Sequence, residues 1–362
     1  MDVSALEAAL VDNPDDPAPY LVHADWLQAQ GDPRGELIVL QHRGVDPAAH
    51  LAKYPELLGP LRSFERPDEK PRGRKVLLKW KLGYVDAIDI GWGMYQRGGT
   101  HAEAVADLTA ILAHPSCRLL SSFEVGPMPT DDMMSFDGAV EAIVAANVRT
   151  LRELELGDIG DWDISSTSTG NFARIAQINK QLRRVRLHAG DITIGEVDLP
   201  ELRTWSIETG ALTKADLAQI AKANVPKLER LEIWCGQSNY GSDLVEDDLD
   251  QILNRPWPKL VKLGIMNCPW IDLAIEKLAK SPLLKQLSHL DLSMGALSSA
   301  GVDKLVEHAD RFQHVKLDVS DNALDDDALP KLARFGVTEL GEQDPGRVED
   351  DDPYSRYTSV GE

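Results

Sequence analysis

Residues 287–297 read Leu-Ser-His-Leu-Asp-Leu-Ser-Met-Gly-Ala-Leu, and the same spacing of apolar residues recurs at 260–270 and at 314–324. Each copy begins 27 residues after the previous one. Positions 4 and 6 of a copy alternate as residues on one face of a short strand do. Position 9 is Cys268, Gly295 or Asn322, a small or amide residue that suits a turn with buried backbone. The spacing therefore predicts stacked units of strand, turn and returning helix.

The pattern resembles the leucine-rich repeat, L-x-x-L-x-L-x-x-(N/C)-x-L, whose period is about 20–29 residues. The resemblance implies an α/β fold, a leucine-rich repeat solenoid with a curved parallel β-sheet on the concave face and helices on the convex face. Weaker copies of the signature predict further strands. Together the predicted strands span 85–90, 120–125, 151–156, 182–187, 202–207, 228–233, 260–265, 287–292 and 314–319. The short return after Leu182 contains Gly190, Gly195 and Pro200, so we expect an extended or 3₁₀ connection there.

Residues 1–43 predict an all-α cap. Gly31 suits the position after a helix end, and Asp32 followed by Pro33 suits the start of the next helix. The runs Ala24-Asp25-Trp26-Leu27 and Gly31-Asp32-Pro33-Arg34-Gly35-Glu36 resemble the bacterial repeat-companion domain, although His23 departs from its pattern. That resemblance implies a cap beside repeats and no defined activity. Tyr20 and Trp26 are expected in the core; a recognition surface around Asp25, Trp26 and Arg34 is the alternative.

Composition limits the function. The net charge of −21 argues against DNA, RNA or an anionic membrane as the main partner. Three separated cysteines, Cys117, Cys235 and Cys268, predict buried, reduced thiols in a reducing compartment. No secretory signal and no long apolar run are present in this sequence, so we expect a cytoplasmic protein, monomeric by itself.

We expect four parts: a repeat-companion domain at 1–43, a helical and basic connector at 44–79, the solenoid at 80–340, and an acidic tail at 341–362. Charge reverses within 62–81, which holds eight Lys or Arg and three acids. This basic segment would bind an anionic ligand, or it would be solvated or paired with acidic parts of the same chain.

Residues at positions 2, 3, 5 and 7 of each unit should lie on the exposed sheet face. They include a basic island bordered by acids and by two large apolar side chains, while later strands add Lys262, His289, Asp291, Lys316 and Asp318. The candidate partner-binding residues are Arg183, Arg184, Arg186, Arg203, Arg230, Glu232, Trp234 and Met266. The alternative is charge pairing between neighbouring strands, such as Glu229 with Arg203 or Glu155 with Arg186.

Catalytic motifs are lacking. Gly91-Trp92-Gly93 with Gly98-Gly99 does not have the spacing or the G-K-[ST] ending of a phosphate loop. The histidines form no H-E-x-x-H, and no His/Cys cluster has metal-ligand spacing. We therefore expect no enzyme, no cofactor and no metal.

The last 22 residues contain seven acids and few aliphatic residues, which predicts a disordered tail. Its end carries Tyr354, Tyr357 and Val360, which could be recognised by a partner or could cover the edge of the last strand. The sequence thus predicts a non-enzymatic scaffold that binds a protein or peptide on the concave face. The alternative is a substrate or adaptor whose tail is recognised, cleaved or modified by a partner enzyme.

Overall fold

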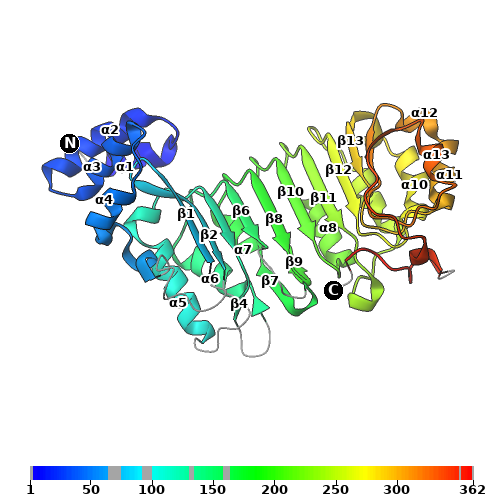
Figure 1. The fold of residues 1–362 in the computed structure, drawn as a ribbon, viewed down its shortest axis with the longest axis horizontal. Helices are drawn as coiled ribbons and strands as arrows, with labels where there is room; N and C mark the ends of the chain where they lie inside the picture. The colour runs from blue at the N-terminus through cyan, green and yellow to red at the C-terminus, as the bar shows by residue number, and fades with distance from the viewer. Residues whose placement is uncertain are drawn as a thin grey trace. The chain divides into compact units, whose positions relative to one another are not determined.

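The structure is a computed structural model that describes residues 3–63, 75–91, 100–129, 134–157, 164–349 and 352–360. The chain forms two compact units, unit 1 at 1–158 and unit 2 at 159–362. This division differs from the predicted boundaries at 43, 79 and 340. In both units parallel strands alternate with helices (Figure 1), so the α/β class is confirmed.

Unit 1 begins with helices and continues into strands. Its helices are α1 (Val3–Asp12), α2 (Pro17–Ala29), α3 (Pro33–His42), α4 (Ala48–Lys53), α5 (His101–Leu112) and α6 (Asp137–Ala145), with 3₁₀ turns at Pro55–Leu57, Gly59–Ser63 and Pro115–Cys117. Its strands are β1 (Lys75–Lys81), β2 (Tyr84–Gly91), β3 (Ser122–Val125), β4 (Met128–Pro129), β5 (Met134–Ser135) and β6 (Glu153–Leu156). Strand β2 pairs antiparallel with β1 and parallel with β3, which pairs parallel with β6.

The expected helix start at Asp32 is confirmed, because its side chain accepts a hydrogen bond from the Arg34 amide at 2.8 Å and Pro33 follows it. The helical cap does not close a core of its own. Tyr20 and Ile38 belong to the same buried cluster as Tyr84 of β2. The cap and the first strands of unit 1 therefore share one core.

The alternative recognition surface around Asp25, Trp26 and Arg34 is not assembled as one exposed patch. Arg34 is only 7% exposed, and its Nη1 donates to the Gly83 carbonyl at 2.9 Å and to Ser116 Oγ at 3.1 Å. Trp26 is half-buried and stacks on His23, while Asp25 is exposed. Arg34 thus joins helix α3 to the hairpin that β1 and β2 form.

Unit 2 continues the alternation. Its strands are β7 (Thr167–Asn171), β8 (Arg184–His188), β9 (Asp191–Thr193), β10 (Thr204–Glu208), β11 (Arg230–Trp234), β12 (Lys262–Met266), β13 (His289–Asp291), β14 (Lys316–Asp318) and β15 (Gly336–Glu339). Strands β8, β10, β11, β12, β13, β14 and β15 lie side by side and pair parallel in that order, and β7 pairs with β9.

Helices return the chain between most of these strands (Figure 1). They are α7 (Ala173–Ile178), α8 (Lys214–Lys222), α9 (Asp250–Leu253), α10 (Ile271–Lys280), α11 (Ser299–Glu307), α12 (Ala309–Phe312) and α13 (Leu329–Leu332). Short 3₁₀ turns lie at Ile164–Ser166, Ser238–Tyr240, Glu246–Leu249, Leu283–Gln286 and Pro345–Val348. The connection from β8 to β10 holds no helix, as the glycines and the proline there predict.

Each copy of the 27-residue pattern places its residues alike. Leu263, Leu290 and Leu317 are register neighbours on adjacent strands and are buried. Shortly after these strands, Asn267, Met294 and Asp321 have left-handed backbones with φ of 49°, 66° and 55°. The three turns are also 27 residues apart in sequence, so the chain leaves each strand in the same way.

The tail differs from the disordered segment that its composition predicts. Thr358 is buried, and its hydroxyl accepts a hydrogen bond from Gln237 Nε2 at 2.8 Å. The Ser359 amide donates to the Met294 carbonyl at 2.9 Å, and Arg356 forms an ion pair with Asp272 at 2.8 Å. Residues 358–360 therefore pack along the turns that follow β11, β12 and β13.

Parts of the predicted basic segment and glycine loop, residues 64–74 and 92–99, lie outside the described residues. Strand β1 occupies 75–81 at the end of the basic segment, where we expected a connector. Cys117, Cys235 and Cys268 are free and buried, as expected. Across the described residues, no helix has both the length and the apolar character needed to cross a membrane.

Candidate functional site

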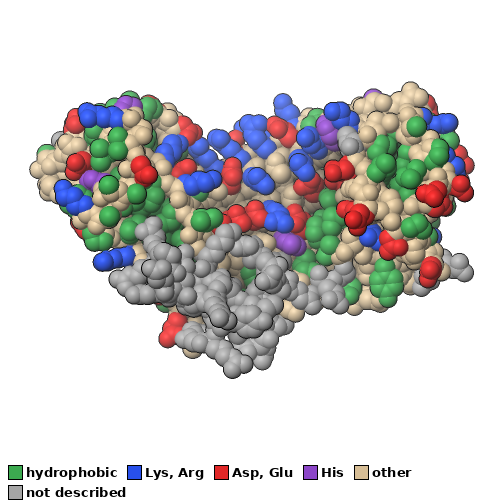
Figure 2. Space-filling model, viewed as in Figure 1, with side chains coloured by type: hydrophobic (Ala, Val, Ile, Leu, Met, Phe, Trp, Pro, Cys, Tyr) green, Lys and Arg blue, Asp and Glu red, His purple; other side chains and the backbone are tan. Residues whose placement is uncertain are grey.

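Strand register in unit 2 aligns charged side chains into two rows on the face opposite the buried leucines. Arg230, Lys262, His289 and Lys316 occupy equivalent positions on β11, β12, β13 and β14. We call these four residues the basic row. Two residues further along the same strands, Glu232, Asp291 and Asp318 form the acidic row, with Gly264 between Glu232 and Asp291. Figure 2 shows basic and acidic side chains gathered over the strands of unit 2.

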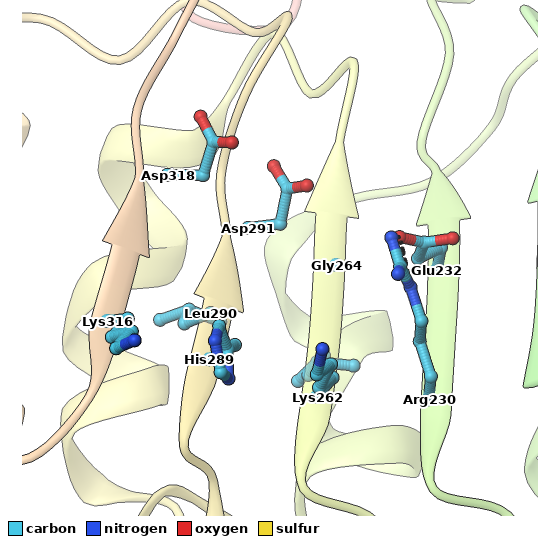
Figure 3. A pocket seen from close by; sticks show the side chains of 10 residues that line it. Arg230, Glu232, Lys262, Gly264, His289, Leu290, Asp291, Lys316 and Asp318 are labelled. Atoms are coloured by element: carbon cyan, nitrogen blue, oxygen red, sulfur yellow. Dashed lines mark hydrogen bonds and ion pairs between the residues drawn. The ribbon is translucent and has the colours of Figure 1, made fainter. Parts of the chain in front are cut away.

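A hollow of about 160 Å³ lies between the rows (Figure 3). Its lining comprises the basic row, the acidic row, Leu263, Gly264 and Leu290. Gly264 keeps the floor open, because a Cβ there would lie 3.2 Å from both Glu232 Cγ and Met266 Sδ. Any larger side chain at 264 would project into this space, since Gly264 has the same orientation as Glu232 and Asp291.

Two of the four residues of the basic row are cations without carboxylate partners among the described residues. Arg230 forms an ion pair with Glu232 of its own strand. Among the described residues, Lys262 and Lys316 make no ion pair. Burial and then the charges of Lys262 and Lys316 lower the pKa of His289. Arg230 and Lys262 are like charges on directly opposed strand positions, which are destabilising, so this part of the row costs the fold some stability.

Two residues of the acidic row, Asp291 and Asp318, accept hydrogen bonds from the serine two positions later on the same strand end. Asp291 Oδ1 accepts from the Ser293 amide at 3.0 Å. Asp318 Oδ1 accepts from the Ser320 amide at 3.0 Å and from the Ser320 hydroxyl at 2.7 Å. Within the described part of the chain, neither carboxylate makes an ion pair. Burial raises the pKa of Asp291 against the opposing Ser293 hydrogen bonds, and the nearby Asp318 and Glu232 charges raise it further.

Replacing Asp291 by asparagine is expected to stabilise the protein by roughly 0.5–1 kcal/mol at pH 7. Asparagine keeps the Oδ1 acceptor for the Ser293 amide and removes a carboxylate whose ionisation is opposed by burial. Because folding raises the pKa of Asp291 above 3.8, ionisation costs stability at neutral pH, and the gain shrinks as the pH falls through the folded-state pKa. Thermal unfolding at neutral and acidic pH measures this. The exposed Asp310→Asn is the control, and an unchanged midpoint for Asp291→Asn at pH 7 would contradict the expectation.

Two of the four arginines of the predicted island are paired within the chain. Arg186 donates to both carboxylate oxygens of Glu208, at 2.8 and 2.7 Å. Arg203 forms the predicted ion pair with Glu229 at 2.8 Å. Arg183 and Arg184 are exposed and make no ion pair with the described residues. The charge pairing that the sequence offered as an alternative therefore accounts for much of this island.

The two apolar candidates, Trp234 and Met266, are the last residues of β11 and β12, two of the strands that line the hollow. Trp234 is 8% exposed and packs edge-on against His188, with ring centroids 5.5 Å apart. Met266 is half-buried and lies close to the position where a Gly264 side chain would be. Trp234 is thus mainly a packing residue, whereas Met266 borders the hollow.

The hollow lies over β11–β14, beside the island that we selected from the sequence. Lys262, His289, Asp291, Lys316 and Asp318 face outward as predicted, but we did not place them among the candidate site residues. A signal for them exists in the sequence. The triplets Arg230-Leu-Glu232, His289-Leu-Asp291 and Lys316-Leu-Asp318 repeat one order, basic then acidic, on three of the four strands, and Lys262-Leu-Gly264 on β12 lacks the acid.

The three tail candidates take different positions. Tyr354 donates a hydrogen bond from its hydroxyl to Glu246. Tyr357 is 66% exposed. The Val360 backbone pairs with the Asn267 side chain, which donates to the Val360 carbonyl at 2.6 Å and accepts from its amide at 3.1 Å. Only Tyr357 therefore presents most of its side chain to solvent.

Among the described residues, no three His, Cys, Asp or Glu side chains come together as metal ligands would. No family model and no curated protein matches this chain. Comparison with solved structures finds a Bacteroides fragilis protein whose crystal structure was determined as a structural-genomics target. The TM-score is 0.62 at 21% sequence identity, over 75% of this chain and 77% of that chain. The two chains share a fold.

Proposed function

We propose that this protein is a non-enzymatic binding protein, a leucine-rich repeat array that recognises a protein or peptide on the outward sheet face of unit 2. One observation carries the proposal. Lys262, Lys316, Asp291 and Asp318 surround a hollow on paired strands, and none of them makes an ion pair among the described residues. The repeat-companion domain would then be the cap of this array, as the resemblance of residues 1–43 implies.

The repeat assignment is supported by the equivalent positions in unit 2. Buried Leu263, Leu290 and Leu317 share one register, and Asn267, Met294 and Asp321 share one left-handed turn at the same 27-residue spacing. A row of strands in such an array presents a broad, preformed face. Binding on a preformed face needs little ordering of the protein, which favours affinity.

The energetics of the face also support recognition. Like charges aligned on adjacent strands cost stability, and a stable fold would be served better by pairing them or by neutral residues. Functional sites commonly keep such unfavourable groups, because a partner neutralises them on binding. Free buried cysteines support a reducing compartment such as the cytoplasm.

Reversing two charges of the basic row tests this function. Peptides selected on the native protein from a phage-displayed random library should bind the Lys262→Glu/Lys316→Glu variant about tenfold more weakly, because attraction to their acidic groups becomes repulsion. Fluorescence anisotropy of the synthesised peptides measures the affinities. Lys259→Glu/Lys285→Glu reverses two exposed lysines outside the hollow and is the matched control.

Circular dichroism of both variants shows whether they keep the native fold. If the selected peptides bind all three proteins equally, the outward face of β11–β14 is not the binding site and the proposal is wrong.

A second candidate is recognition of the tail by a modifying enzyme. The observation that favours it is the exposure of Tyr357, at 66%, within a segment whose neighbours Arg356 and Thr358 are anchored to unit 2. Intact mass of the protein isolated from its native cells tests this candidate. An unmodified, full-length tail would count against it.

A further inference from the structure

The two charged rows in unit 2 have a fixed separation and a fixed order. Residues two apart in a parallel strand are about 6.6 Å apart along the strand. On β13 and β14 the basic residue comes first and the acidic residue follows, and Figure 3 shows both pairs in the same order. The hollow is therefore dipolar, with one positive side and one negative side.

Apart from the Arg230–Glu232 ion pair, the charged side chains of the two sides do not pair with each other. Lys316 and Asp318 are neighbours on one strand face, yet they form no ion pair, and neither do Lys262 and Asp291 on adjacent strands. One oxygen of each aspartate is already engaged by the serine two residues later. Their remaining acceptor capacity and the lysine ammonium groups are therefore available to a ligand.

We propose that the hollow binds an extended peptide segment that carries one acidic and one basic side chain two positions apart. This inference rests on the proposed function and names the chemistry of its partner. Side chains at positions i and i+2 of an extended peptide lie on the same side, about 6.6–6.8 Å apart. Laid along the strands, such a peptide sets its acid beside Lys262 and Lys316 and its base beside Asp291 and Asp318.

Partners of one charge fit the hollow less well. A polyacidic segment or a nucleic-acid phosphate would meet the aspartates, and a polybasic segment would meet the lysines. Like charges brought together at a binding face are repelled, which is how such a face excludes wrong partners. The volume of about 160 Å³ corresponds to roughly five water molecules, enough for the ends of two side chains.

Binding of such a peptide would change the pKa values of His289 and Asp291. The charges of Lys262 and Lys316 help to lower the pKa of His289, and those of Asp318 and Glu232 help to raise the pKa of Asp291. A carboxylate bound at the basic row would raise the pKa of His289, and a cation bound at the acidic row would lower the pKa of Asp291. Both pKa values would return towards their ordinary range on binding.

Four labelled peptides of equal length test the inference on the full chain. The first carries Glu-Ala-Lys units separated by Gly-Ser-Gly, the second has the same composition with Glu and Lys adjacent in each unit (Glu-Lys-Ala), the third replaces Lys by Glu, and the fourth replaces Glu by Lys. The first peptide should bind about fivefold more tightly than each of the others. NMR titration of the His289 ring should show its pKa rising with the first peptide.

Neutralising one row at a time should exchange these preferences. Asp291→Asn/Asp318→Asn should lose the preference for the first peptide and favour the polyacidic one, whereas Lys262→Gln/Lys316→Gln should favour the polybasic one. Asp310→Asn/Asp327→Asn and Lys259→Gln/Lys285→Gln change the same charges at exposed positions outside the hollow and should leave all four affinities unchanged.

The outcomes separate this inference from the proposed function. If the polyacidic peptide binds as tightly as the first one, and the Asn variant does not change the preference, the dipolar inference is overturned while the binding face stands. If none of the four peptides binds, the dipolar inference is again overturned, and the library-selected peptides decide on the binding face independently.

Discussion

Replacing Asp272 by alanine is expected to destabilise the protein by about 3–5 kcal/mol, the cost of breaking a buried ion pair by removing one partner. Asp272 is 4% exposed in the first turn of α10. Its Oδ2 is 2.8 Å from Arg356 Nη1, and its Oδ1 accepts from the Ser298 amide at 2.9 Å. The substitution would leave the half-buried guanidinium and the start of α11 without this acceptor.

Urea-induced unfolding measures the loss, and a double-mutant cycle isolates the ion pair. Asp272→Ala/Arg356→Ala should be less destabilised than the sum of the two single variants, because the second substitution removes the uncompensated charge. The exposed Asp310→Ala should change stability by less than about 0.5 kcal/mol. If the urea midpoint of Asp272→Ala equals that of the native protein, this contact between tail and helix is not part of the folded protein in solution.

Replacing Asn322 by alanine is expected to cost about 2–4 kcal/mol, because several buried backbone groups would lose their partner together. The Asn322 side chain is fully buried. Its Oδ1 accepts from the Leu297 amide at 2.9 Å, and its Nδ2 donates to the carbonyls of Leu292, Val319 and Ser320 at 2.9 to 3.1 Å. One side-chain amide thereby provides hydrogen-bond partners for backbone groups of the turn that follows β14 and of the neighbouring turn.

Thermal and urea unfolding measure the effect of Asn322→Ala, and Asn254→Ala, an exposed asparagine, is its control. Asn322→Asp should be destabilised as well, since it keeps the acceptor for Leu297 but turns a carboxylate towards three carbonyl groups. A loss for Asn322→Ala no larger than that of the control would show that position 9 is not an internal hydrogen-bonding position.

The strands of the 27-residue copies could be predicted because their signal is local. Alternation around Leu263, Leu290 and Leu317 requires one buried face, and equal spacing requires that successive strands pair in the same register. The role of position 9 also followed from its residue type, and Asn322 makes the hydrogen bonds that an amide at a buried turn should make.

Other elements could not be predicted from local pattern. The sequence of β1 predicts a basic connector, because its lysines interrupt a short alternation of apolar residues. The segment forms a strand because it pairs with β2 through a turn with positive φ at Leu82 and Gly83. The tail lacks the aliphatic residues that would signal burial. It is held instead by polar contacts with Asn267, Met294 and Asp272, residues 60 or more positions away in sequence.

The candidate site likewise has features that the sequence predicts and features that it does not. The sequence by itself determined which side chains face outward on each strand, because alternation in a half-buried strand has a period of two residues. Which of those side chains find a partner depends on the residues that come beside them in space. Arg186 meets Glu208 and is neutralised, whereas Lys262 lies beside Arg230, Lys316 lies beside His289, and Gly264 opens the floor of the hollow. Register between strands is a long-range property, so only the tertiary structure decided where the charged hollow lies.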